Sequence, residues 1–539
     1  MHNDVVEPPS EYRSITDVLA VQVSERPEAT FLRYRDQTYS YAEVDHRSNA
    51  IANELNAQGI ESGDVVCLYL YNSPEFLFCL FALAKLGAVA APIDTRFKRD
   101  SLAHILSETE ADTLVFGANT RTAYEEVRHR IPSITTEYYV GPVRLEHPYR
   151  RFDELLEGSV DRPVGGDVDG SDPFTITYIQ RYASEHPKGV VLPHFSYVNT
   201  GWECAHNLFG FSGSDCIFTT LPLYSSYPLQ IGMTGAMVVG AEFAFAKRFR
   251  PELFWEQTRE HGATVFLYLD RMLSVLYNRG IEAETMETPV TLALGHGFGF
   301  ETDENIIDRF EQAFDLTVLE GYGVTATATI ATFNRPEDRR VGSVGRPVSH
   351  AEIEIVDEND WPVEPGNTGE IVVRSTRPNA MIREYYRNPE ATVDVCRNQW
   401  IHTNDIGYVD EEGYLFFIAS QENTIYRGRV VGRISALEIE SIINAHPDVV
   451  ESAVVGVTNE IGEEEIKAAV VPREDASLTP VEVCQHCEKR LAYLKVPRYI
   501  EVRSELPRSP SGKIQKSELR AAHGRKSAWD RESGYELSR

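Results

Sequence analysis

Short apolar runs alternate with amphipathic stretches along most of the chain. Residues 65–70, 113–116 and 263–267 are continuous runs of apolar and β-branched residues, the pattern of strands that are buried on both faces. Between such runs, residues 76–86 and 254–261 have apolar positions at helical spacing. This alternation predicts α/β layers with partly parallel sheets.

The pattern changes beyond Trp400. A strand-like run at 413–418 is followed by a polar, charge-rich connection, then by a helical pattern at 436–445 and by two further strand-like runs at 452–457 and 466–471. We therefore expect a compact α+β unit of about 120 residues, joined to the rest near residues 419–423. The predicted organisation is a loose tail at 1–13, a large multi-layer domain at 14–419, a small C-terminal domain at 420–523 and a loose tail at 524–539.

Length, charge and cysteine usage narrow the class of protein. The 539 residues exceed what one core usually holds, and a formal net charge of −30 disfavours nucleic acids and anionic membranes as partners. No apolar run is long enough to span a bilayer, and the N-terminus has no signal-peptide pattern. The seven cysteines are mostly scattered, and the close pair Cys484 and Cys487 lacks a second pair to complete a zinc site. We expect a cytoplasmic protein without disulfides, a bound structural metal or a membrane span.

Seven segments, in order, carry short motifs that are typical of one protein family, among them Pro-Lys-Gly at 187–189 and Gly-Tyr-Gly at 321–323. The segments are residues 38–43, 83–93, 187–191, 319–325, 342–347, 400–405 and 506–513. Together they resemble the acyl-CoA synthetase branch of the adenylate-forming superfamily, which includes fatty-acyl and carnitine-type CoA ligases, luciferases and peptide-synthetase adenylation domains. The resemblance covers about residues 10 to 520. It implies the α/β fold given above, with a small C-terminal domain that is mobile and swings about residues 419–423.

The resemblance also implies a chemistry. Such ligases activate a carboxylic acid with ATP as an acyl-AMP, with Mg²⁺ as the metal, and then pass the acyl group to coenzyme A or to an amine. The expected ligands are therefore ATP or AMP, Mg²⁺, coenzyme A and an acyl substrate.

Five positions match nucleotide-binding or catalytic residues of the family. Tyr322 matches the aromatic residue beside adenine, Thr325 the hydroxyl at the α-phosphate, and Asp405 the carboxylate that binds both ribose hydroxyls. Lys188 belongs to the Pro-Lys-Gly motif, and Lys513 matches the catalytic lysine that holds the substrate carboxylate against the α-phosphate. Without the motifs around them, an aspartate in a turn would be interpreted as a cap and a lone lysine as a solvated surface residue.

The phosphate loop departs from the family. The strand at 174–178 is followed by residues 179–186, which contain no glycine, although a loop that wraps a triphosphate needs glycine for close approach and for an anion nest. Tyr182 is bulky, and Glu185 adds a negative charge. Arg181 is a candidate replacement ligand because guanidinium binds phosphate oxygens bidentately. The alternative is a closed loop that no longer binds phosphate.

Three further positions differ from the family pattern. Ala326 stands where a glutamate usually binds magnesium, a metal that prefers hard carboxylate oxygens. Ser420 replaces a basic ribose ligand, and Asn404 replaces the glycine before Asp405. These substitutions predict weak or atypical use of ATP.

The acyl pocket is expected at residues 221–230 and at the turn 295–298. Tyr224, Ser225 and Gln230 are the candidate pocket residues of the first segment, with Ser225 in place of the usual histidine. Gly297 is the candidate in the turn, and the neighbouring His296 is a candidate catalytic base because imidazole titrates near neutrality. A histidine that is simply packed is the alternative.

Three functions remain open from the sequence. The first is a ligase that forms acyl-AMP and an acyl-CoA or amide product. The second is a relative that does not adenylate but transfers or condenses an acyl group that is already activated. The third is a non-catalytic protein that binds a ligand or partner. The retained nucleotide residues favour the first, and the altered phosphate loop favours the other two.

Overall fold

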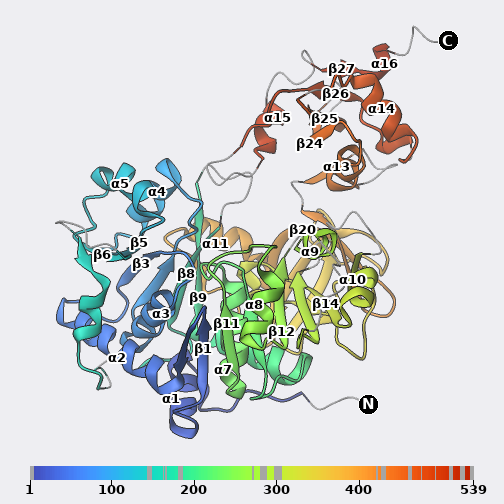
Figure 1. Ribbon diagram of the computed structural model, residues 1–539. Coiled ribbons are helices and arrows are strands. Elements are labelled where there is room, and N and C mark those ends of the chain that lie inside the picture. The colour runs from blue at the N-terminus through green and yellow to red at the C-terminus, as the bar shows by residue number, and fades with distance from the viewer. Residues whose placement is uncertain are drawn as a thin grey trace.

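Figure 1 shows a large N-terminal domain and a smaller C-terminal domain, drawn in red, that stands apart from it in this view. The fold, a computed structural model, describes residues 5–142, 149–161, 163, 167–179, 186–269, 272–279, 288–296, 306–420, 423–426, 433–458, 464–474, 476–491, 493–508, 514–521 and 528–534. The predicted fold class, a large multi-layer α/β domain with a small α+β domain, is confirmed.

An eight-stranded sheet is built mainly from parallel strands, with antiparallel pairing only at the edge formed by β8, β9 and β19. In spatial order its strands are β19 (Glu384–Tyr385), β9 (Lys188–Pro193), β8 (Pro173–Ile179), β4 (Val89–Pro92), β3 (Val65–Tyr69), β5 (Thr113–Gly117), β6 (Thr136–Val140) and β7 (Arg150–Arg151). Side chains of β3 alternate between two apolar cores: Val66 and Leu68 face one, and Cys67 and Tyr69 face the other. Both faces are therefore covered, as the apolar runs predicted.

A nine-stranded sheet forms the second layer and has a parallel centre. Its strands, in spatial order, are β16 (Arg346–Pro347), β15 (Thr332–Phe333), β14 (Thr317–Tyr322), β13 (Leu292–His296), β12 (Val265–Leu269), β10 (Cys216–Thr219), β11 (Glu242–Phe245), β1 (Thr30–Tyr34) and β2 (Gln37–Ser40). The core that contains Val66 and Leu68 also contains the centre of this sheet, so one apolar core joins the two layers.

Helix α3 (Pro74–Leu86) is apolar around its whole circumference, a pattern that predicts burial on every side. All its residues are buried except Glu75 and Lys85. The Lys85 ammonium donates to Asp45 and Asn49 of α2 at 2.7 and 2.6 Å, which satisfies a cation at the edge of the core. The other helices of the large domain are α1 (Ile15–Glu25), α2 (Tyr41–Ala57), α4 (Arg99–Glu108), α5 (Arg121–Val127), α6 (His194–Trp202), α7 (Gly235–Val239), α8 (Phe254–His261), α9 (Met272–Arg279), α10 (Ile306–Phe314) and α11 (Pro389–Val395).

A four-stranded antiparallel sheet completes the large domain. Its strands, in spatial order, are β17 (Ala351–Val356), β18 (Gly369–Ser375), β20 (Ile401–Val409) and β21 (Leu415–Ser420). The backbone of Val344 donates to Leu415 O at 2.8 Å, and Leu415 donates to Gly345 O at 2.9 Å, so β21 is bonded to the segment that leads into β16. This sheet therefore lies beside the β14 end of the nine-stranded sheet.

The C-terminal domain has its own sheet and core. Its elements are β22 (Thr424–Tyr426), β23 (Arg433–Ser435), α13 (Ala436–Asn444), β24 (Val449–Thr458), β25 (Glu464–Pro472), α14 (Pro480–Glu488), β26 (Tyr499–Val502), α15 (Lys516–Ala521), β27 (Trp529–Asp530) and α16 (Arg531–Gly534). Cys484 and Cys487 lie on α14 with both thiols buried in this core, as the interpretation of a helix that carries two thiols predicted. Burial raises the pKa of Cys484 to about 11 and that of Cys487 to about 12, which keeps both protonated.

Polar side chains connect the two domains near the predicted joint. The Asn423 amide donates to Ser420 Oγ at 2.9 Å and accepts from the Lys516 ammonium at 2.6 Å. Lys516 is buried and also contacts Glu440 of α13. The end of β21 is thus linked to α15 and α13, while residues 421–422 of the joint lie outside the described part.

Parts of the two segments that the sequence predicts to be loose are packed. The indole of Trp202 donates to Val6 O at 2.8 Å, and its ring meets the edge of Tyr12 at 5.8 Å. At the C-terminal end, β27 pairs with β26, and Arg498 Nε lies 3.3 Å from Asp530 Oδ1. Polar composition predicted loose ends because it gives no sign of these partners, which lie far away in the sequence. No helix in the described ranges is long and apolar enough to cross a membrane.

Asn72 holds the carboxyl ends of the two large sheets together. It follows β3 of the eight-stranded sheet, and its amide donates to Leu221 O and Ala246 O, just beyond β10 and β11, at 2.8 and 2.9 Å. Its side-chain oxygen accepts the backbone N–H of Leu223 at 2.8 Å. The side chain is buried, so no water replaces these bonds if it is removed.

We predict that Asn72→Ala lowers the free energy of unfolding of the large domain by about 3 kcal/mol, because it leaves three buried backbone groups unpaired. Urea unfolding followed by tryptophan fluorescence measures the change. Asn53→Ala is the matched control, since Asn53 also donates to two carbonyls but is only half-buried, with both bonds exposed to solvent, and should cost less than about 1 kcal/mol. Equal losses in the two variants would contradict this role of Asn72.

Candidate functional site

The ends of β13 and β14 place several predicted residues side by side. His296 is the last residue of β13 and is paired in register with Gly321, next to Tyr322 at the end of β14. Thr325 begins the short 3-10 helix η5 (Thr325–Thr327) that follows. In a parallel sheet, ligands bind beyond the carboxyl ends of the strands, so this is the expected side for a site.

A buried hydrogen bond joins the predicted adenine and ribose residues. The Tyr322 hydroxyl donates to a carboxylate oxygen of Asp405 at 2.8 Å, across two different sheets. Tyr322 is fully buried with its ring 5.8 Å from that of Phe417, and Asp405 is 8% exposed. Asp405 lies opposite Ser420 in the pairing of β20 with β21, so the position of the missing basic ribose ligand is directly beside it. The structure therefore brings Tyr322, Asp405 and Ser420 together.

Asn404 has the backbone conformation that explains the glycine of the family pattern. Its φ is +55°, in the left-handed region that glycine adopts freely and that asparagine tolerates better than most residues. The sequence departure at this position is therefore structurally conservative.

The turn after Tyr322 connects the predicted nucleotide residues with the predicted acyl segment. Ala328 and Thr329 have φ values of +51° and +77°, which are rare for residues with a Cβ atom and unusual for a β-branched threonine. The turn is tight, since a Cβ atom on Gly323 would lie 2.1 Å from Thr329 O. The hydroxyls of Thr329 and Ser226 are 3.0 Å apart, which ties the turn to the predicted pocket segment. Backbone strain of this kind is often found at functional sites.

His296 is buried against the acyl segment and does not titrate near neutrality. Its ring meets the edge of the Tyr227 ring at a centroid distance of 4.5 Å, and the Tyr227 hydroxyl donates to Leu294 O at 3.0 Å. Burial lowers the pKa of His296 to about 3, while a hydrogen bond with the backbone of Thr329 acts in the opposite direction. The expectation of an imidazole poised near pH 7 is corrected, because desolvation disfavours the charged form. A role for the neutral ring in catalysis stays a prediction.

A charged pair just after β4 contacts Tyr224 of the predicted acyl segment, and the motifs did not indicate it. Arg96 Nη2 binds Asp94 Oδ2 at 2.7 Å, and both residues interact with Tyr224. Burial, then the negative charge of Asp94, raises the pKa of Tyr224. Asp94 and Arg96 follow β4, so their position at the end of a parallel strand was the only signal available.

Ser225 lies in the middle of the predicted acyl segment, and Gln230 lies at its end. Ser225 is half-buried, and its N–H donates to Pro222 O at 3.1 Å. Gln230 is fully buried in the π-helix η4 (Pro228–Thr234), and within the described part of the chain its amide has no hydrogen-bond partner. A π-helical turn is frequent at functional sites, and a buried amide requires a partner.

Of the remaining predicted residues, the structure describes Lys188. Lys188 is exposed at the start of β9, with its ammonium 5.9 Å from the centre of the Tyr385 ring. Arg181, Gly297 and Lys513 lie outside the described residues, as do the other residues from 180 to 185 in the phosphate loop.

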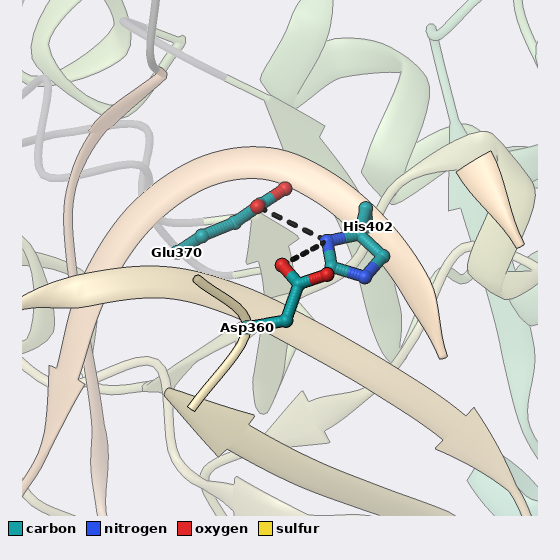
Figure 2. A group of neighbouring side chains, drawn as sticks. All are labelled: Asp360, Glu370 and His402. Atoms are coloured by element: carbon teal, nitrogen blue, oxygen red, sulfur yellow. Dashed lines mark hydrogen bonds and ion pairs between the residues drawn. The ribbon is translucent and has the colours of Figure 1, made fainter. Parts of the chain in front are cut away.

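A cluster of residues that are suitable metal ligands includes His402 on the strand that carries Asp405, and the sequence predicted no metal ligand there. Asp360, Glu370 and His402 converge with one ligand atom of each within 4.8 Å of the others, as Figure 2 shows. His402 is 2% exposed, and it lines a cavity of about 300 Å³ together with Asp360, Trp361 and Trp400. His402 stands on β20 three residues before Asp405, and Glu370 stands on β18.

The fold and these strand ends define a class of protein. The AMP-binding enzyme family matches residues 19–386, and the family of AMP-binding enzyme C-terminal domains matches residues 438–513. The chain belongs to the AMP-binding enzyme family and thus to the adenylate-forming superfamily, as its motifs predicted.

Individual relatives lie among the CoA ligases. Crotonobetaine/carnitine–CoA ligase of Escherichia coli O8 (strain IAI1) is 31% identical over 490 residues, which cover 89% of this chain and 93% of the ligase. A fatty acyl CoA synthetase of Mycobacterium tuberculosis has a TM-score of 0.73 and 27% identity, with 95% of this chain and 98% of that chain covered. An anthranilate CoA ligase in complex with anthranoyl-AMP has a TM-score of 0.83 and 23% identity, with 95% and 97% covered, which supports the fold.

We predict that His296 makes the protein less stable in acid. Its pKa is about 3 in the folded state and about 6.5 when the chain unfolds, so the unfolded state binds the extra proton between these values. Stability therefore falls as pH drops from 6.5 towards 3. Between pH 7.5 and pH 4.5, His296→Gln should lose about 2.7 kcal/mol less stability than the wild type, at about 1.36 kcal/mol for each of about two pH units below 6.5.

Urea unfolding at the two pH values measures the difference. His129→Gln, at an exposed position, is the control and should keep the wild-type pH dependence. A wild-type pH dependence in His296→Gln would show that His296 is not buried in its neutral form.

Proposed function

We propose that the protein is an acid–thiol ligase of the adenylate-forming type. It activates a carboxylic acid with ATP as an acyl-AMP and releases pyrophosphate. It then transfers the acyl group to the thiol of coenzyme A, or alternatively to an amine, and releases AMP. The observation that carries this proposal is the buried Tyr322–Asp405 pair at the strand ends, in a chain of this family. The CoA ligases among its relatives support coenzyme A as the acceptor.

Each residue of the site has a proposed task. The Tyr322 ring lies against adenine, the Thr325 hydroxyl binds the α-phosphate, and the Asp405 carboxylate accepts hydrogen bonds from the ribose hydroxyls. Lys513 holds the substrate carboxylate against the α-phosphate and stabilises the negative charge that develops there. Because Asp405 and Tyr322 are already bonded to each other, the AMP half of the site is preorganised.

The acyl group is proposed to lie along the segment that contains Tyr224, Ser225 and Gln230, close to the turn at Gly297. Gln230 offers a buried amide there, and His296 and Tyr227 close one side with aromatic rings. A polar group on the acyl chain would give Gln230 the hydrogen-bond partner that a buried amide requires.

The triphosphate half of the site is proposed to be weak. The loop at 179–186 has no glycine and carries Glu185, and Ser420 provides no positive charge beside Asp405. Arg181 is the one candidate in the loop for binding phosphate. The methyl group of Ala326 does not fit a magnesium site, because Mg²⁺ requires oxygen ligands, and we derive no step through the metal.

The same departures favour a second candidate function. A relative that accepts an acyl group already activated would keep the acyl and CoA surfaces and would not need a triphosphate loop. A non-catalytic binding protein is the third candidate, and it would bind neither ATP nor coenzyme A. Binding of coenzyme A without ATP would favour the second candidate over the first.

The two domains are proposed to work as a large domain at 14–419 and a mobile domain at 420–523. One orientation delivers Lys513 to the site, and another opens a path for the thiol. The hydrogen bonds from Ser420 to Asn423 and from Asn423 to Lys516 lie at the proposed pivot, so the motion would either preserve or break them.

We predict weak carboxylate-dependent exchange between ATP and pyrophosphate across short, long and aromatic acids. Ala326→Glu restores the carboxylate that the family uses for magnesium, and it should raise the exchange rate about tenfold or more, as expected for charge stabilisation at a phosphoryl centre. Ala328→Glu, two residues away in the same buried turn, is the matched control and should not raise the rate. Robust exchange in the wild type, or no gain in Ala326→Glu with its fold intact, would contradict the proposed weakness.

A second prediction separates a weak ligase from a protein that has lost the reaction. Lys513→Ala removes a cation from the charge that develops during adenylation, which should cost about a hundredfold in that step. Capture of a supplied acyl-adenylate by coenzyme A should change little, because that step uses the other domain orientation. Equal adenylation rates in the wild type and the variant would contradict the role of Lys513.

A further inference from the structure

The backbone before Asp405 is held in an unfavourable conformation. Asn404 has φ +55°, which costs a residue with a Cβ atom roughly 1–2 kcal/mol relative to the right-handed region. The pairing of β18 with β20 shifts register between Glu370 and Val372, next to this residue. A local irregularity of this kind re-aims the side chain that follows it, which here is Asp405.

Glu370 bonds directly to the strained residue. One oxygen of its carboxylate, Oε1, accepts the N–H of Asn404 at 2.9 Å. The other, Oε2, lies 3.1 Å from Nδ1 of His402, on the same strand two residues earlier (Figure 2). One side chain of β18 therefore contacts β20 on both sides of Thr403.

Thr403 fixes the backbone between these contacts. Its hydroxyl donates to Ile371 O at 2.7 Å and accepts the N–H of Asp405 at 3.1 Å. The three residues before the Asp405 carboxylate are thus all bonded to Glu370 or to its neighbour Ile371. This arrangement leaves little freedom for the direction of Asp405.

A second layer of side chains keeps Glu370 in place. Arg397 approaches both carboxylates, with Nε 3.2 Å from Asp360 Oδ2 and Nη2 3.5 Å from Glu370 Oε2. The Asn398 amide donates to Asp360 at 2.9 Å. Arg397 lowers the pKa of Asp360, so this carboxyl is ionised and attracts the cation in turn.

These contacts also help to decide whether the cluster of Asp360, Glu370 and His402 binds a metal ion. Asp360, Glu370 and His402 are suitable ligands for a divalent cation. However, Arg397 supplies a positive charge to both carboxylates, and the Asn404 N–H uses Glu370 Oε1. The oxygens are therefore partnered within the chain, which favours a supporting role.

We propose that Glu370 is a positioning residue for nucleotide binding, which acts by holding Asn404 in its left-handed conformation so that Asp405 points at the ribose. The proposal rests on the proposed function, in which Asp405 binds the ribose hydroxyls. Glu370 itself does not touch the nucleotide. Its loss lets Asn404 relax to a right-handed or extended backbone and turns the carboxylate of Asp405 away.

The test is the affinity of the full-length protein for AMP, measured by calorimetry. Glu370→Ala should weaken AMP binding about tenfold or more, the effect of losing a hydrogen bond to a charged group. Glu370→Gln should keep most of the affinity, because its amide oxygen still accepts from Asn404. Adding Asn404→Gly to Glu370→Ala should restore much of the affinity, because glycine adopts the left-handed conformation without support.

Two controls separate positioning from other causes. Glu352→Ala removes a carboxylate from the neighbouring strand β17, where Glu352 pairs with Arg374 at the surface, and should leave AMP binding unchanged. Asp405→Asn should abolish most AMP binding. If wild type binds AMP and Asp405→Asn binds it equally well, the proposed ribose site fails before Glu370 is tested.

Other outcomes overturn the positioning proposal alone. If Asp405→Asn loses AMP binding but folded Glu370→Ala does not, Glu370 has no such role. If Glu370→Ala loses affinity and Asn404→Gly gives no rescue in a folded double variant, the left-handed conformation is not what Glu370 maintains. If dialysis of the wild type against a chelator removes AMP binding and Zn²⁺ or Mn²⁺ restores it, the cluster is a metal site instead.

Discussion

The site depends on the requirement that the parallel strands of two sheets present their carboxyl ends to one region. Asn72 satisfies this requirement with three buried hydrogen bonds between the ends of β3, β10 and β11. This arrangement sets the positions of His296 and Tyr322, which end β13 and β14, and of the predicted acyl segment, which follows β10. The antiparallel sheet of β17, β18, β20 and β21 then supplies Asp405 from the side, and its bond to Tyr322 joins the two parts.

The two halves of the nucleotide site differ in how well they are built. On the AMP side, a buried hydroxyl–carboxylate pair is supported by a strained asparagine and by a network of charged residues behind it. On the proposed phosphate side, the loop at 179–186 has no glycine, and Ala326 stands where the family has a carboxylate. Under the proposed function, Asp405 keeps a directional contact to ribose, and the protein has fewer charges to offset the triphosphate.

The sequence predicted the fold class because the short apolar runs form the buried strands of the two large sheets, and the stretches with helical spacing form the helices between them. It also predicted which motifs would meet, and Tyr322, Asp405 and Ser420 do lie together. It could not predict the burial that lowers the pKa of His296, since burial is set by Tyr227 and other residues distant in sequence. The Asp94–Arg96–Tyr224 and Glu370–His402 contacts were missed for the same reason, and only the position of Asp94 and Arg96 after a strand gave a local signal.

We propose that the AMP half of the site is intact and the triphosphate half is weak. Calorimetric titration of one preparation with AMP and with ATP, both in the presence of Mg²⁺, tests it most directly. We predict that AMP binds and that ATP binds no more than about tenfold tighter, because the added phosphates gain few contacts. Failure to bind AMP, or binding of ATP about a hundredfold or more tighter than AMP, would contradict the account.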